Sequence, residues 1–272
     1  MSKKNLVIYT YFEKDNIYKD NLMFFLKMGL CDECDYIFVI NGECSVNIPN
    51  QSNIKILRRD NKDYDFGGFA HALNFIDIDK YNYYIFLNTS VRGPFIPPYA
   101  NIKWYEAFTN MIKGDVKLVG VTINILNSPH SGHSQIFESI TGIKRPHTHV
   151  QSYFFAMDKE CLSYIINSTD IFRKFDYKDF ADFIVKKELM MSQLVLKNGW
   201  NIGGIVQEYK DIDFRKLEID ISNSYIYEND PVYPNNCFGR TLHPYECIFI
   251  KINRGISVNE INSLSRYIFE KN

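Results

Sequence analysis

The first half of the chain alternates between short runs of consecutive hydrophobic residues and stretches with hydrophobic residues at helical spacing. The runs predict buried strands, whereas Leu22, Phe25, Leu26 and Leu30 have the spacing of an amphipathic helix. Strands that alternate with helices indicate an α/β fold with a mainly parallel central sheet flanked by helices. The predicted strands cover residues 6–11, 36–40, 54–57, 83–87 and 116–122, and the predicted helices cover 21–30, 67–76 and 104–111.

The second half of the chain has a less regular pattern. Residues 124–146 are rich in Ser, His, Gly and Pro, which predicts a long loop. The clearest helix is expected over residues 180–198, where hydrophobic residues recur at helical spacing until Gly199 ends the pattern. Further strands are predicted at 150–157, 202–206 and 247–252, and further helices at 159–166 and 259–270. No repeat or linker divides the chain, so we predict one domain over residues 1–272.

Composition excludes several classes of partner. The formal net charge is −1 without a basic cluster, which argues against nucleic-acid binding. No apolar run reaches about 18 residues, so no membrane insertion is expected. The six cysteines include a Cys31–Cys34 C-x-x-C pair without a second pair at zinc-site spacing, which favours a reduced, cytoplasmic protein. The 15% of aromatic residues reflect either sugar-stacking surface or codon bias.

Polar residues follow the predicted strands, and ligands of open parallel sheets bind beyond the carboxyl ends of the strands. Thr10 and Tyr11 end the first strand, and Arg59 follows the third, where it can bind phosphate with two hydrogen bonds. Asp65 precedes the Gly67-Gly68 pair at a helix start. It either caps this helix or accepts hydrogen bonds from ribose hydroxyls.

The segment after the fourth strand is the most informative. Many sugar-nucleotide enzymes carry an Asp-x-Asp pair at this place, which holds a divalent ion on the diphosphate. Here the pair is Asn88 and Ser90, whose neutral oxygens bind Mg²⁺ or Mn²⁺ weakly, and Arg92 offers a positive charge instead. A purely structural turn is the alternative. His149 and Gln151 begin a later strand on the same face and are predicted to contact a sugar.

Five segments together resemble a known family. They resemble the GT-A-type glycosyltransferases of large DNA viruses, algae and some bacteria, in which Asn-x-Ser-x-Arg-Gly-Pro stands in place of Asp-x-Asp. The resemblance spans nearly the whole chain. Its segments are Arg59-x-Asn61-x-x-x-Asp65-x-Gly67, Asn88-Thr89-Ser90-Val91-Arg92-Gly93-Pro94, His149-Val150-Gln151-Ser152, Glu188-x-x-x-Ser192 and His243-Pro244-Tyr245-Glu246, the last followed by Lys251 and Arg254.

The resemblance implies a GT-A fold and transfer of a hexosyl or pentosyl group from a nucleotide sugar, in particular a UDP-sugar, to a hydroxyl of a saccharide acceptor. Residues 1–123 would then form the nucleotide-sugar half, and residues 124–272 the acceptor half with the C-terminal segment. Late basic residues of such enzymes hold the diphosphate, which assigns this role to Lys251 and Arg254, with His243 in the donor site. If Mn²⁺ or Mg²⁺ takes part, Asn88, Ser90 and His243 are its candidate ligands.

Inverting transfer also requires a general base, because the acceptor hydroxyl loses its proton as it attacks. Glu188 is the candidate, with Asp182 six residues earlier as its competitor and a solvated helix carboxylate as the structural alternative. Two other functions remain open at this point. A nucleotidyltransferase acting on sugar phosphates would need a Gly-rich N-terminal loop, which Thr10-Tyr11-Phe12 does not supply. A non-catalytic glycan-binding protein would not need the carboxylate and basic residues at the strand ends.

Overall fold

The centre of the fold is a seven-stranded sheet. A computed structural model of the chain describes residues 4–173, 176–217 and 230–271. The strand order is β10-β6-β9-β4-β1-β2-β3, and β9 alone runs antiparallel to its neighbours β4 and β6. The predicted α/β class with a mainly parallel sheet is confirmed. The strands are β1 (Asn5–Tyr11), β2 (Cys34–Asn41), β3 (Ile54–Arg59), β4 (Tyr83–Asn88), β6 (Val116–Gly120), β9 (Phe154–Asp158) and β10 (Asn201–Gly204).

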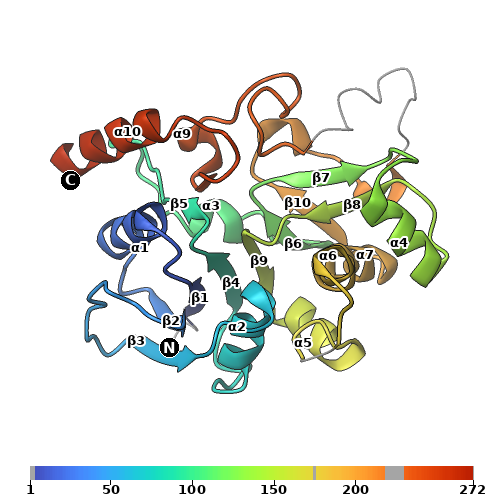
Figure 1. The fold of residues 1–272 in the computed structure, drawn as a ribbon, viewed down its shortest axis with the longest axis horizontal. Coiled ribbons are helices and arrows are strands. Elements are labelled where there is room, and N and C mark those ends of the chain that lie inside the picture. Colours follow the sequence, from blue (N-terminus) through green and yellow to red (C-terminus); the bar gives the residue numbers. More distant parts are fainter. Residues whose placement is uncertain (1–3, 174–175, 218–229, 272) are drawn as a thin grey trace.

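Helices flank this sheet (Figure 1). At one end, α1 and the C-terminal α10 lie together, and the ring centroids of Phe24 and Phe269 are 5.2 Å apart. At the other end, α4 packs against the helix that begins with α6. None of the described helices combines the length and apolar character that a bilayer span requires. The helices are α1 (Asn16–Met28), α2 (Tyr64–Leu73), α3 (Glu106–Thr109), α4 (Gly132–Thr141), α5 (Lys159–Ser168), α6 (Phe180–Ile184), α7 (Met190–Lys197), α9 (Pro244–Cys247) and α10 (Val258–Lys271).

The strand order reverses beside β1. The chain passes from β1 to β2 and β3 on one side and then returns to β4 on the other side. Such a reversal opens a crevice at the carboxyl ends of the two central strands, which is where open α/β sheets bind ligands. Thr10 and Asn88 are register partners at this edge. The α2 helix crosses close to it, since a Cβ on Gly68 would lie 2.4 Å from Thr10 Cγ2.

Residues 124–146 are not the predicted long loop. They contain the end of β7 (Ile123–Leu126) and all of α4, and β7 pairs with β8 (His147–Val150) in a separate two-stranded sheet. The Ser131 hydroxyl caps α4, and Gly142 ends it in the left-handed conformation. The buried residues of α4 are Ser134 and Phe137.

Two of the predicted late strands also differ from the structure. The expected strand 150–157 is divided between β8 and β9, which belong to different sheets. The expected strand 247–252 is reduced to β11 (Ile250–Lys251), because α9 ends at Cys247 and Ile248 follows with φ 63°. The β11 strand pairs antiparallel with β5 (Val91–Arg92), which brings the C-terminal segment next to the turn after β4.

The predicted long helix is present, with an irregularity in its middle. It runs from Phe180 to Lys197 as α6, a π-helical turn η1 (Val185–Leu189), and α7. Single π turns within α-helices occur frequently at functional sites. Here the turn contains Glu188.

Candidate active site

A cavity of about 600 Å³ opens at the carboxyl ends of β1 and β4. It is bounded by α2, by the α6–η1 helix and by the C-terminal segment around β11. The topology therefore brings together side chains that lie up to about 240 positions apart in the sequence. The predicted site residues that line it are Thr10, Asp65, Asn88, Ser90, His149, Gln151, Glu188, Lys251 and Arg254.

Asn88, Ser90 and Asp65 form a closed hydrogen-bonded group at the end of β4. Asn88 Oδ1 accepts hydrogen bonds from the Ser90 backbone N–H at 2.9 Å and from Ser90 Oγ at 2.6 Å. Asn88 Nδ2 donates to Asp65 Oδ2 at 2.5 Å. Asp65 lies in the first turn of α2 and is not its cap, because the cap position belongs to Asp63. The capping alternative for Asp65 is therefore wrong, and its carboxylate faces the strand end.

These donors fit a divalent ion poorly. Both acceptor positions of Asn88 Oδ1 are used within the turn, which leaves Asp65 as the carboxylate at this edge. The predicted third ligand, His243, is exposed, and its Nδ1 accepts a hydrogen bond from the Tyr245 N–H at the start of α9. Within the described parts of the chain, no three His, Cys, Asp or Glu side chains are grouped as metal ligands. The side chains of Asn88, Ser90 and His243 therefore do not converge on one ion.

Lys251 and Arg254 supply positive charge to the cavity. Among the described residues, none forms a hydrogen bond or ion pair with the Lys251 ammonium, which lies 5.0 Å from the centroid of the Tyr153 ring. Burial lowers the pKa of Lys251, as does Arg254, while the charges of Glu188, Asp65 and Asp230 oppose this shift. The Arg254 Nε is buried without a hydrogen-bond partner in the described structure. Both residues are half-buried, and Arg254 Nη1 donates to the Asn253 carbonyl at 3.2 Å. Two such cations without an ion-pair partner among the described residues favour an anionic ligand.

Glu188 lies in the same cavity and forms a pair with His149. Its Oε1 is 3.2 Å from His149 Nε2, and its Oε2 accepts a hydrogen bond of 2.6 Å from the Ser152 N–H. Burial alone would raise the pKa of Glu188, but His149 and the Ser152 N–H outweigh it and lower this pKa to about 2. The competitor Asp182 does not line the cavity, and its Oδ2 accepts hydrogen bonds from Lys186 Nζ and the Lys178 N–H.

Several predicted donor-binding residues lie outside this cavity. Arg92 is buried, and its guanidinium donates to Asn21 of α1 and Asn262 of α10, so that it connects three elements of the fold. The Tyr11 hydroxyl donates to Glu13 Oε2 at 2.8 Å. Neither Arg92, Tyr11 nor the exposed His243 is part of the cavity lining.

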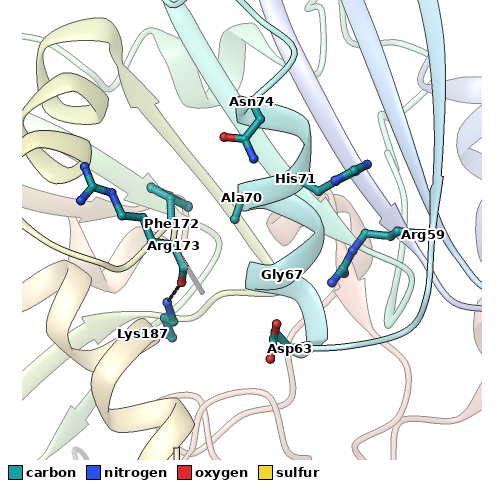
Figure 2. A pocket seen from close by; sticks show the side chains of 9 residues that line it. All are labelled: Arg59, Asp63, Gly67, Ala70, His71, Asn74, Phe172, Arg173 and Lys187. Carbon is teal, nitrogen blue, oxygen red and sulfur yellow. Dashed lines mark hydrogen bonds between the residues drawn. The ribbon is translucent and has the colours of Figure 1, made fainter. Parts of the chain in front are cut away.

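Arg59 and Gly67 line a second cavity of about 340 Å³ beside α2 (Figure 2). The Arg59 guanidinium donates to Asn41 Oδ1 at 2.9 Å and to the Lys62 carbonyl at 2.7 Å. It lies against Gly67, where an added Cβ would be 3.0 Å from Arg59 Nη2. The predicted phosphate contact of Arg59 thus receives no support from its position.

The sequence interpretation missed other residues of the large cavity. They include Tyr64 and Phe180, which line it with large exposed rings, and Asp230, whose Oδ1 accepts a hydrogen bond of 3.0 Å from Gln151 Nε2. Tyr64 and Phe180 could have been found as aromatic residues that lie close in sequence to the polar candidate segments. Asp230 had no such signal.

Lys187 fixes the helix that carries Glu188. Its ammonium donates to the carbonyls of Asp170, Ile171 and Arg173, each at 2.7 Å, and Figure 2 shows the last of these bonds. We expect Lys187→Met to lower the free energy of unfolding by about 3 kcal/mol, since hydrogen bonds to a charged group are lost and carbonyls are left unpaired. Urea denaturation measures this.

The matched control for this prediction is Lys186→Met. It removes the neighbouring ammonium, whose Nζ is 2.8 Å from Asp182 Oδ2, and an ion pair near the surface contributes about 1 kcal/mol or less. Equal losses of stability in the two variants would contradict the prediction, because the three hydrogen bonds of Lys187 to carbonyls would then stabilise the fold no more than the ion pair of Lys186.

Asp65 gives the protein a defined pH dependence. Burial raises the pKa of Asp65 to about 6, although Lys251 and Asn88 oppose this and Glu188 adds to it. In the unfolded chain an Asp has a pKa of about 4. The folded state therefore retains a proton that the unfolded chain loses, and Asp65 makes the protein less stable as the pH rises from about 4 to about 6.

Asp65→Asn removes this titration. We expect the melting temperature of the variant, relative to that of the native protein, to increase between pH 4 and pH 6 and then to stay level. Differential scanning calorimetry across this range measures the difference, and Asp32→Asn at an exposed position is the control. A difference that does not change with pH would contradict the prediction.

Sheet topology and site together define the class of the protein. A switch point beside β1, a cavity at the ends of β1 and β4, and a short polar segment after β4 make it a GT-A-type, glycosyltransferase-like protein. The chain belongs to the family described as "RgpF: Rhamnan synthesis protein F", which matches residues 37–236. No curated protein sequence matches it. The narrower expectation of a viral and algal group stays a prediction.

Solved structures agree at the level of the fold. The galactosyltransferase LgtC, solved in complex with donor and acceptor sugar analogs, has a TM-score of 0.50 and 8% sequence identity, and the match covers 97% of this chain and 95% of that chain. The mannosyltransferase PcManGT from Pyrobaculum calidifontis, in complex with GDP-Man and Mn²⁺, has 12% identity over 75% of this chain and a TM-score of 0.44. This chain spans 55% of the length of that protein.

Proposed function

We propose that this protein transfers a sugar from a nucleotide sugar, in particular a UDP-sugar, to a hydroxyl of a saccharide acceptor with inversion. The observation that carries the proposal is the composition of one cavity. It combines two half-buried cations, Lys251 and Arg254, which form no ion pair with any described residue, with a buried ionised carboxylate, Glu188, at the switch point of a GT-A-type sheet. The cations suit a diphosphate, and the carboxylate suits a proton transfer.

Lys251 and Arg254 stabilise the leaving group in this mechanism. The bond between the anomeric carbon and the diphosphate oxygen breaks, and its electron pair stays on the nucleoside diphosphate. A preorganised positive charge at that oxygen stabilises the transition state without reorganisation. The donor itself lies along Thr10, Asp65 and the Asn88–Ser90 turn, which line the same edge of the sheet. We assign no metal ion to this step, because the candidate ligands Asn88, Ser90 and His243 do not converge on one position.

The acceptor side is formed by Glu188, His149 and Gln151. The acceptor hydroxyl oxygen forms the new bond to the anomeric carbon, and its proton passes to the His149–Glu188 pair. A carboxylate with a pKa of about 2 holds a proton poorly, so we assign the proton to the pair rather than to Glu188 alone. Glu188 then also orients the imidazole through Nε2.

The family description favours a narrower substrate. Rhamnan is a polymer of rhamnose, a deoxyhexose, and a member of this family is expected to act on a rhamnose-containing glycan. The test is a thermal-shift panel of UDP-, dTDP-, GDP- and CMP-linked sugars, each with EDTA and with Mn²⁺. A ligand at 100 times its Kd stabilises the fold by about 2.7 kcal/mol. Stabilisation by one nucleotide class in EDTA supports the proposal, and no shift across the panel contradicts it.

A further inference from the structure

An aromatic shelf borders the proposed active site. It consists of Tyr64 at the start of α2 and Phe180 at the start of α6, whose ring centroids are 5.1 Å apart at an angle of 70°. Both residues line the large cavity, and 45% of Tyr64 and 55% of Phe180 is exposed. The buried Phe183 ring packs against the Tyr64 ring, and the two ring centroids are 4.9 Å apart. Two adjacent exposed rings at the edge of a cavity are an apolar surface on which a ligand can pack.

The shelf continues the helix face that carries Glu188. Phe180, Ile184 and Glu188 follow one another at intervals of four residues, and all three line the cavity. Eight residues of helix extend about 12 Å, which is longer than one pyranose ring. A saccharide whose reacting hydroxyl lies at Glu188 therefore reaches the shelf with a further sugar residue.

The backbone beneath the shelf is strained. Asp63 and Tyr64 have φ values of 59° and 47°, a region that bulky side chains rarely adopt. Such conformations persist where the surrounding structure holds them, and they concentrate at ligand-binding sites. Here the strain turns the Tyr64 ring toward Phe180 and Phe183, with which it packs.

We propose that Tyr64 and Phe180 bind the apolar face of a second sugar residue of the acceptor, so that the substrate is an oligosaccharide rather than a monosaccharide. The inference rests on the proposed function and names the acceptor subsite within it. The acceptor is favoured over the nucleobase because Phe180 shares a helix with Glu188. Lys251 and Arg254 flank Asn253 on the side of α1, where Asn253 Nδ2 donates to the Tyr18 hydroxyl at 3.0 Å.

The test compares Phe180→Ala with Phe75→Ala, which removes a ring of similar exposure, 50%, outside the cavity. We expect Phe180→Ala to raise the KM for a rhamnose-containing oligosaccharide about tenfold more than the KM for the monosaccharide, since stacking on one ring contributes on this order. Phe75→Ala leaves both values unchanged. A weaker donor Kd with an unchanged KM ratio would assign the shelf to the nucleobase and overturn the proposal.

A second variant and a second readout keep this test separate from the transfer reaction. Tyr64→Gly removes the other ring at a position where glycine accepts the positive φ without strain. Saturation-transfer NMR reports saccharide binding even if no transfer occurs. Binding by the native protein that is lost in both variants supports the shelf, whether or not the enzyme proposal holds. Equal binding by the native protein and both variants, or none by the native protein, would overturn it.

Discussion

Replacing Lys251 by methionine is expected to lower kcat/KM for the nucleotide-sugar donor by at least about a hundredfold without lowering the melting temperature. Removing one preorganised group that stabilises charge in a transition state typically lowers the rate about a hundredfold or more. The melting temperature stays nearly level, because the half-buried native ammonium has no hydrogen-bond or ion-pair partner among the described residues, so that its removal breaks no such bond. Steady-state kinetics and thermal unfolding of the same preparation measure both effects.

A lower kcat/KM with an unchanged melting temperature distinguishes a charge that binds the ligand from a charge that stabilises the fold. Lys251→Arg retains the charge and is expected to recover part of the activity, whereas Lys113→Met removes an exposed ammonium elsewhere and serves as the control. If Lys251→Met kept full activity but unfolded at a lower temperature, Lys251 would be a structural residue and the proposed diphosphate site would be wrong.

Replacing Glu188 by glutamine is expected to reduce kcat about a thousandfold and to leave the donor Kd within a few-fold of the native value. General-base assistance contributes about 10² to 10⁴ in rate. Glutamine has nearly the same shape and still accepts the Ser152 N–H, so that the helix turn around it is retained. Rapid-mixing kinetics separates the chemical step from donor binding, which titration calorimetry measures.

Asp182→Asn is the matched control for Glu188→Gln. It neutralises a carboxylate on the same helix that lies outside the cavity and pairs with Lys186. We expect its kcat to stay within a few-fold of the native value. A similar kcat in native protein and Glu188→Gln would remove Glu188 from the proton transfer, and loss of donor binding in this variant would place it in the donor site instead.

The sheet was predictable from sequence because its central strands are buried on both faces. Continuous hydrophobic runs such as those of β1 and β4 identify central strands of a parallel sheet. The α4 helix escaped prediction because the Ser, His, Gly and Pro residues in and around it have the composition of a loop. The π turn around Glu188 escaped as well, since the hydrophobic spacing of residues 180–198 matches an ordinary helix.

The sequence predicted the position of the site, which follows from the sheet topology, but not the contacts of each side chain in it. The rule that ligands bind at strand ends selected Asp65 and Asn88 separately, the structure joins them by a hydrogen bond, and β11 brings Lys251 to the same edge. Residue type alone does not show how a side chain is used. Arg59 and Arg92 could both bind phosphate, yet the hydrogen bonds of Arg59 to Asn41 and Lys62 and those of Arg92 to Asn21 and Asn262 hold the fold together.

The central claim is that the protein transfers a glycosyl group, and mass spectrometry of a saccharide acceptor tests it most directly. The native protein is incubated with the nucleotide sugar that stabilises it and with rhamnose-containing oligosaccharides. We predict that the acceptor gains the mass of one glycosyl residue while a free nucleoside diphosphate appears, and that Glu188→Gln forms almost no product. An unchanged acceptor, or the release of pyrophosphate in place of a nucleoside diphosphate, would contradict glycosyl transfer.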